Sequence, residues 1–130
     1  MLTGTILGKQ TVHDVEASWV LNHQFVQLHE VSRETTVKGA PAYEALVFLG
    51  WDEKRQKYVA HWIDVFGGGF SLREDGLREK SSIPLVFKSE EGAFYTTFVY
   101  ESGSGDWEWT MDSEENGKTV PFARLRMAKR

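Results

Sequence analysis

The sequence predicts an all-β chain, most simply an antiparallel up-and-down β-barrel of about eight to ten strands. Aromatic residues make up 13% of its 130 residues and stand in short segments beside β-branched residues, a composition that strands favour. Clusters of Gly, Asn, Asp and Glu separate these segments at the spacing typical of a meander. Closing the barrel would remove the unpaired strand edges through which an open, aromatic-rich sheet aggregates.

Candidate strands and turn signals alternate along the chain. Turns are expected at short runs rich in Gly, Pro, Asn and Asp. These runs are residues 38–41, 52–54, 67–69, 91–92, 102–105 and 116–117. The candidate strands are Thr3–Val12, Gln24–Ser32, Tyr43–Trp51, Lys57–Phe66, Gly69–Arg73, Pro84–Lys88, Ala93–Glu101, Asp106–Met111 and Val120–Met127.

The first part of the chain contains one segment that fits two structures. Val12–Leu21 follows the first candidate strand, and its valines and Trp19 form an apolar stripe at helical spacing. The same residues alternate about as well as in a strand. The sequence alone therefore leaves helix and strand open here.

The middle of the chain is expected to form a hairpin. Tyr43–Trp51 and Lys57–Phe66 are its strands, and the polar run between them has no apolar face to bury, which is typical of a loop. The glycines at 67–69 follow without the lysine and the serine or threonine of a phosphate-binding loop. We interpret them as a flexible loop beside the barrel mouth.

The last strands differ in how they alternate. Ala93–Glu101 is partly apolar on both faces, so both faces need cover. Asp106–Met111 alternates cleanly, with two tryptophans and a methionine on one face. The acidic run at 112–115 is interpreted as a solvated turn. Asn116-Gly117 is the sharpest hairpin signal, because both residues tolerate the positive φ of a type I′ turn.

Composition and charge exclude several classes of function. The net charge of −4 and the pI near 5.6 give no basic field to attract nucleic acid or an anionic membrane. The longest apolar run, Ala45–Leu49, is far shorter than the ~20 residues of a membrane span. The first residues lack the features of a signal peptide, so a cytoplasmic location is expected. Without cysteine, disulfides, thiolate nucleophiles and Cys-based metal sites are excluded. A single domain covering residues 1–130 is expected.

Four stretches together resemble one protein family. They are Trp19–Phe25, the two parts of the central hairpin at Tyr43–Asp52 and Tyr58–Asp64, and Pro121–Arg126. They are similar to the bacterial calycin-like, lipocalin-related proteins of unknown function. The central hairpin carries the likeness, with its apolar strand, Gly-aromatic-Asp, polar turn and Trp-x-Asp. The resemblance implies an antiparallel calycin barrel, but it brings no established reaction or ligand and no catalytic residues.

The candidate ligand-binding residues combine aromatic and acidic groups within the predicted strands. They are Tyr43, Tyr58, Trp62, Asp64, Glu30, His29 and His61. Trp62 shares a strand face with Asp64. Either Trp62 fills the core while Asp64 accepts turn N–H groups, or Trp62 walls a cavity and Asp64 orients a ligand at its mouth. Glu30 and Glu44 are expected to point outward; facing inward, either could anchor a ligand or act as a general acid.

The four histidines form no recognisable metal motif. His23 and His29 would stand about 20 Å apart in one regular strand, too far to share a metal. His61 and Asp64 differ by an odd number of residues, so they point to opposite faces. A solvated or hydrogen-bonded role is expected for each histidine. No metal site is therefore expected.

Three functions are compatible with such a barrel. The first is binding of one apolar or amphipathic small molecule in the interior, because several strands carry apolar residues on both faces. The second is an enzyme in which Glu30 or Glu44 works with His29 or His61 in proton transfer, although no nucleophile–base–orienter set is visible. The third is a haem-binding barrel with one histidine ligand. We expect the first, with no cofactor, no nucleic acid and no membrane partner.

A homodimer is also a hypothesis from the sequence. If Trp107, Trp109 and Met111 point outward, they form an apolar patch of a size that monomers rarely expose. Such a patch would join two copies through their sheet outer faces, with two-fold symmetry. If these side chains point inward, they belong to the core or line a cavity, and no such patch forms.

Overall fold

The computed structural model describes residues 1–67, 72–76, 81–89 and 92–129. These residues contain ten strands and no helix. The strands are β1 (Leu2–Ile6), β2 (Lys9–Val20), β3 (Phe25–Ser32), β4 (Glu44–Asp52), β5 (Lys57–Asp64), β6 (Leu72–Gly76), β7 (Ser82–Ser89), β8 (Gly92–Glu101), β9 (Asp106–Glu115) and β10 (Lys118–Met127). The described part of the chain accordingly offers no helix long and apolar enough to cross a membrane.

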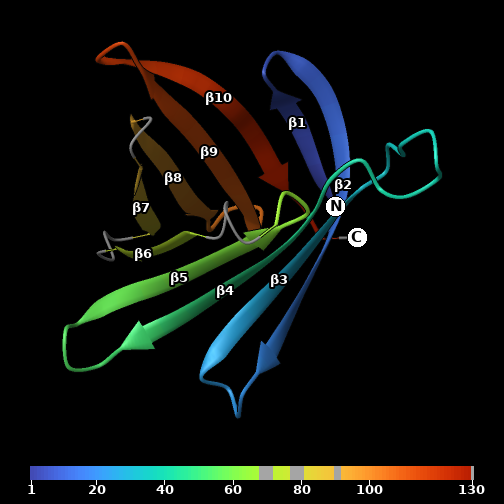
Figure 1. Cartoon of the computed structure of the whole chain (residues 1–130). Helices are drawn as coiled ribbons and strands as arrows, with labels where there is room; N and C mark the ends of the chain where they lie inside the picture. The colour runs from blue at the N-terminus through green and yellow to red at the C-terminus, as the bar shows by residue number, and fades with distance from the viewer. Residues whose placement is uncertain (68–71, 77–80, 90–91, 130) are drawn as a thin grey trace.

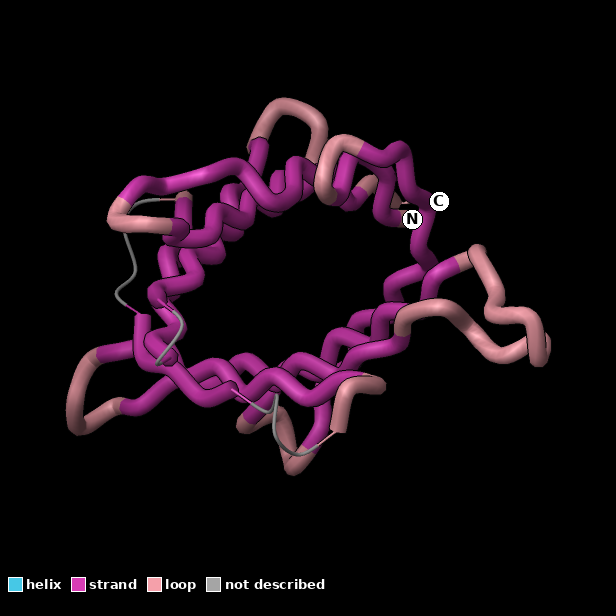
Figure 2. Tube along the Cα trace, turned by 45° about the horizontal axis from the view of Figure 1, so that its top comes forward, coloured by secondary structure: helices cyan, strands magenta, loops and turns pink. Residues whose placement is uncertain are grey.

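The strands form one antiparallel sheet that curls into a nearly closed barrel (Figure 1). Its order is β6-β5-β4-β3-β2-β1-β10-β9-β8-β7. Strands that follow one another in the sequence pair with each other, except β6 and β7, and β1 also pairs with β10. That pairing brings the two ends of the chain together. The strands form a flattened ring in cross-section (Figure 2), and β6 and β7, the two ends of the sheet order, lie in contact. The predicted up-and-down barrel is confirmed.

Two predicted turns are confirmed. The β4–β5 hairpin pairs Asp52 with Lys57 across the polar run, as the sequence indicated. The β9–β10 hairpin turns at Asn116 and Gly117, whose φ angles of 52° and 74° are both positive. Type I′ geometry needs positive φ at both positions, which asparagine and glycine adopt at little cost.

Three sequence expectations about the elements were wrong or undecided. The predicted strand Thr3–Val12 is broken by a tight turn at Leu7 and Gly8, which separates β1 from β2. The ambiguous segment Val12–Leu21 is strand up to Val20, because Val12 and His13 pair with β1 and residues 13–20 pair with β3. The acidic run 112–115 is not a turn but the end of β9, where it pairs with β8 and β10. Of the predicted strand Gly69–Arg73, residues 69–71 lie outside the described residues, as do 68 and 69 of the predicted loop.

Side chains from one face of the strands other than β6 form the core. Trp109 is fully buried, and Leu125 and Phe98 on the neighbouring strands pack beside it. Trp107, Trp109 and Met111 therefore point inward, and the outward patch that led to the homodimer hypothesis is not formed by them. The homodimer itself stays a prediction, which light scattering at micromolar concentration tests.

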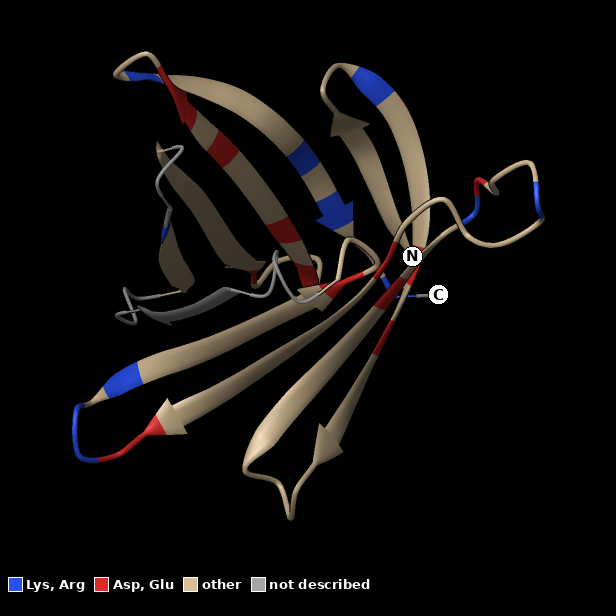
Figure 3. Ribbon diagram, in the orientation of Figure 1, with Lys and Arg blue, Asp and Glu red and all other residues tan. Residues whose placement is uncertain are grey.

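The outer face of β9 and β10 is held by ion pairs. Acidic residues on β9 lie beside basic residues on β10 (Figure 3). Arg124 Nη2 lies 2.7 Å from Asp112 Oδ1, and Arg126 Nη2 lies 2.6 Å from Asp106 Oδ2. Arg124 and Arg126 thus alternate with the buried Ala123 and Leu125 and lie on the outer face of β10.

Candidate functional site

A cavity of about 1080 Å³ opens at one end of the barrel. The β2–β3, β4–β5 and β8–β9 hairpins surround this end, because each contributes lining residues. The wall is mainly apolar and includes Val15, Val26, Leu28, Leu49, Ile83 and Met127. Polar residues also contribute: Asp14 and Glu16 on β2, His23 and Gln24 in the β2–β3 hairpin, and Lys129 in the C-terminal segment. An apolar wall with a few polar groups is typical of small-molecule sites.

Aromatic contacts cross the interior of the barrel deeper than the aromatic residues at the cavity mouth. The rings of Trp62 on β5 and Trp109 on β9 lie 5.3 Å apart, although these strands do not pair in the sheet. Trp62 also contacts Phe87, and Trp109 stacks on Phe98 at 4.8 Å. This cluster joins the two walls. In Figure 1 the β2–β3 and β4–β5 hairpins extend away from the other strands.

Three aromatic pairs surround the cavity mouth. The Trp51 and Tyr58 rings lie 5.0 Å apart, edge to face. Trp107 lies 5.1 Å from Tyr100, and Trp19 lies 5.5 Å from His23. All six rings come from strand ends or the hairpin beside the opening, and all except Tyr100 line the cavity.

A buried polar cluster lies inside the barrel, on the side of the aromatic contact away from the mouth. His13 on β2 is 4% exposed and Glu30 on β3 is 2% exposed. The Nδ1 atom of His13 lies 2.5 Å from Glu30 Oε1, and Nε2 lies 3.0 Å from Thr11 Oγ1. With Nδ1 donating to the carboxylate, Nε2 of a neutral ring accepts from the threonine hydroxyl. Glu30 Oε2 is buried without a partner among the described residues.

Tyr43 extends this cluster across the barrel. Its ring stacks on His13, with centroids 6.0 Å apart. Its hydroxyl accepts from Trp62 Nε1 at 3.2 Å and donates to Asp64 Oδ2 at 3.4 Å. Burial, reinforced by the Glu30 carboxylate, raises the pKa of the Tyr43 hydroxyl well above its ordinary value of 10.0. The phenol therefore stays protonated and available as a donor.

The structure divides the candidate residues into three groups. Tyr58 lines the cavity. Tyr43, Trp62, Asp64 and Glu30 gather in the buried cluster, so the expected outward placement of Glu30 was wrong. The physical reason is the His13 side chain, which accompanies the carboxylate into the interior and hydrogen-bonds it.

The remaining candidates lie on the outer face. His29 Nε2 lies 2.7 Å from Glu44 Oε1, and both side chains are partly exposed. His61 stands against the edge of Phe25, with ring centroids 6.3 Å apart. None of these residues lines the cavity. Their pairing in proton transfer, considered from the sequence, is therefore not supported at this site.

Sequence reasoning missed His13, Thr11 and Trp19 as site residues. All three lie on β2, in or beside the segment whose structure the sequence left open. In a strand, Thr11, His13 and Val15 share one face, and that face proves to be the interior. The signal was therefore present but depended on the choice between helix and strand. In the described part of the chain, no three His, Asp or Glu side chains gather where they could hold a metal.

No model of a known protein family matches the chain, and no curated protein sequence matches it significantly.

Proposed function

We propose that this chain is a calycin-like barrel protein that binds one small apolar or amphipathic molecule in the cavity at its hairpin end. The observation that carries the proposal is the cavity itself, whose volume of about 1080 Å³ lies just above the range for small-molecule sites, about 300–1,000 Å³. A barrel that only had to be stable would fill this space with side chains, because interiors are otherwise close-packed.

The chemistry of the lining supports an apolar or amphipathic ligand. Val26, Leu49 and Ile83 offer no charge to a buried ligand, whereas Lys129 and His23 stand with the polar groups of the mouth. A ligand with an apolar body and one polar end would satisfy both regions. The calycin-like assignment agrees with the central hairpin motif and with the all-antiparallel barrel.

Native mass spectrometry tests the proposal on the as-purified protein. We expect a retained small molecule or, after its removal, binding of an apolar fluorescent dye. The variant Val26→Trp places an indole in the cavity and should weaken dye binding by about tenfold or more. Gln27→Trp is the matched control, because Gln27 is the next residue of β3 and faces the other way. Equal dye binding by both variants would contradict the proposal.

A second candidate, acid–base catalysis, is favoured by one observation. The buried His13–Glu30 pair is a histidine and a carboxylate within hydrogen-bond distance, the arrangement that proton transfer uses. It ranks second because neither residue lines the cavity.

The third candidate is a haem-binding barrel. His23 is the histidine that lines the cavity and would be the haem ligand. A Soret band in the absorption spectrum of the purified protein tests this candidate.

A further inference from the structure

We infer that the ligand of this cavity contains a flat aromatic ring system, held at the mouth between the Trp51–Tyr58 pair on one wall and Trp107 on the other. The inference rests on the proposed function and names the class of molecule that the cavity takes.

The two aromatic walls belong to opposite sides of the barrel. Trp51 and Tyr58 pair across β4 and β5, and Trp107 lies on β9, which has no ladder with either strand. The Trp62–Trp109 contact joins the same two walls further in. Tyr58 precedes Trp62 by four residues, about 13 Å along the strand, and Trp107 precedes Trp109 by two, about 7 Å. The walls therefore meet at the Trp62–Trp109 contact, and Tyr58 and Trp107 lie nearer the mouth on opposite walls.

The Trp51 indole is held in place before any ligand arrives. Its Nε1 donates to Glu53 Oε2 at 2.7 Å, and Gln56 Nε2 donates to Glu53 Oε1 at 3.1 Å. The Tyr58 ring packs against it edge to face. The indole N–H of Trp51 thus has its hydrogen-bond acceptor, Glu53, within the same hairpin. A ring fixed in this way binds with little further loss of conformational freedom.

The exposure of these rings argues for a partner that stacks. Trp51 is 43% exposed and Trp19 is 61% exposed, although both line the cavity. Large apolar side chains gathered around an opening mark a binding site more often than a chance surface feature. Indole and phenol faces attract other aromatic rings in offset or edge-to-face geometry, beyond what buried area alone contributes. A saturated ligand of the same size would not gain that contribution.

Calorimetric titration with two matched probes tests the inference. The probes are 2-naphthol and decahydro-2-naphthol, which share one carbon skeleton and one hydroxyl, but only the first is flat and aromatic. We expect the wild-type protein to bind 2-naphthol about fivefold or more tightly than the saturated probe, in line with one or two stacking contacts. The variants Trp51→Leu and Trp107→Leu should lose this preference while still binding the saturated probe.

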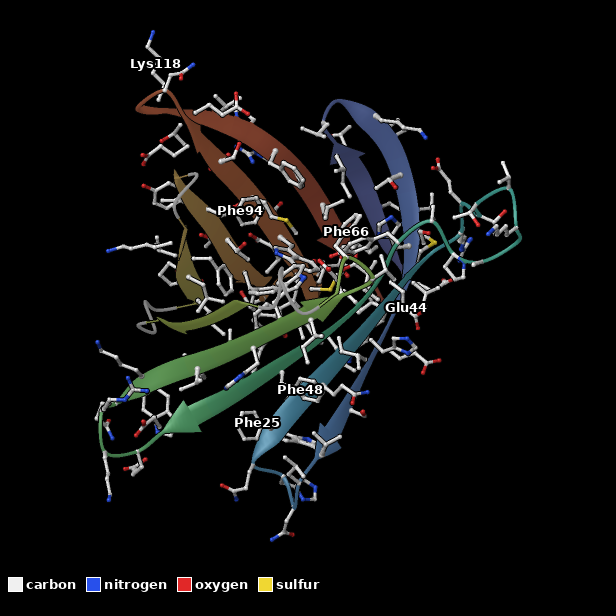
Figure 4. All side chains as sticks on the ribbon, in the orientation of Figure 1. Phe25, Glu44, Phe48, Phe66, Phe94 and Lys118 are labelled. Carbon is white, nitrogen blue, oxygen red and sulfur yellow. The ribbon has the colours of Figure 1, made fainter. Side chains whose placement is uncertain are left out.

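Phe48→Leu is the matched control variant. Phe48 lies between Val47, which is buried in the core, and Leu49, which lines the cavity, so it faces the outside of β4 (Figure 4). It should keep the wild-type preference. Equal affinity of the wild-type protein for both probes would overturn the inference and leave the proposed function standing, even if a tryptophan variant failed to fold. Binding of neither probe would contradict the proposed function and the inference with it.

Discussion

The interior of this barrel contains a buried carboxylate, Glu30, with one hydrogen-bond partner among the described residues. Glu30 is 2% exposed, and one of its oxygens lies against His13 while the other has no partner among the described residues. Burying an ionised carboxylate is costly unless it is hydrogen-bonded and paired. The hydrogen bond from His13 therefore offsets much of the desolvation cost of burying Glu30.

Removing Glu30 should accordingly destabilise the fold. In Glu30→Ala the buried His13 ring loses its acceptor, and we expect the free energy of unfolding to fall by about 3 kcal/mol. Glu44→Ala is the control, because it breaks the partly exposed pair with His29 and should cost about 0.5 kcal/mol. Urea denaturation of both variants measures the difference. Equal losses would mean that burial of the His13–Glu30 pair has no energetic consequence.

Tyr43 should give the barrel a measurable dependence on alkaline pH. Its pKa is raised in the folded state by burial and by Glu30, so above pH ~10 the unfolded chain loses the phenol proton while the folded chain keeps it. The stabilisation is complete below that pH and falls by about 1.4 kcal/mol per pH unit above it, up to the folded pKa.

The variant Tyr43→Phe isolates this effect. At pH 8 the wild type should be the more stable protein, because the variant lacks the hydrogen bonds to Trp62 and Asp64. Between pH 10 and pH 11 that advantage should shrink by about 1 kcal/mol, measured by urea denaturation at each pH. A difference that stays constant over this range would show that the phenol ionises equally in both states.

The sequence indicated the candidate residues better than it indicated their orientation. Tyr43, Trp62 and Asp64 were identified from one motif and do lie together. The direction of Glu30 was wrong because both faces of Gln24–Ser32 mix polar and apolar residues. Alternation then cannot say which face is buried. The partner strand decides it: Val15 is opposite Glu30, and His13, two residues earlier on β2, lies on the same face and hydrogen-bonds the carboxylate.

At the scale of elements, the β1–β10 pairing depends on one glycine. Gly4 has a φ of 151°, and a Cβ atom there would lie 2.0 Å from the carbonyl oxygen of Arg124 on β10. That oxygen belongs to the backbone of a paired strand, so it cannot move without disturbing the ladder. The two terminal strands come this close only because residue 4 has no side chain.

Gly4→Ala should therefore weaken the pairing that joins the ends of the chain. We expect a loss of about 3 kcal/mol from the steric conflict. Gly8→Ala is the matched control, because Gly8 also has positive φ, at 77°, but its Cβ would meet open space. The control should cost about 1 kcal/mol from the backbone conformation alone. Thermal denaturation compares them, and a milder effect at Gly4 than at Gly8 would contradict the steric argument.

Most strands could be predicted because their turns carry local signals. Asn116-Gly117 marks the β9–β10 turn by its residue types alone. The β1–β2 turn has no such mark, since Leu7 adopts a φ of 50° that leucine rarely takes. The pairing of β2 with both β1 and β3 imposes strand on a segment whose local pattern also fits a helix. Where tertiary pairing decides the conformation, the sequence pattern is not sufficient.

At the scale of the whole molecule, the junction between β6 and β7 is where the barrel is held least firmly. In the described residues β6 pairs only with β5, and β7 pairs only with β8. Every other strand has a hydrogen-bonded neighbour on both sides. The contact between β6 and β7 therefore brings the two ends of the sheet together without a ladder of backbone hydrogen bonds. Opening at this line would disturb fewer backbone bonds than opening anywhere else.

Hydrogen exchange of backbone amides tests whether the molecule opens there. We expect amides of β6 and β7 to exchange about tenfold or more faster than those of β3 and β9, which are paired on both sides. The comparison between β7 and β9 is the sharper one, because both strands flank β8 and pair with it. If β7 were as well protected as β9, a continuous ladder would have to close the ring in solution. The two walls around the cavity would then be linked by backbone hydrogen bonds on both sides, instead of only through β1 and β10.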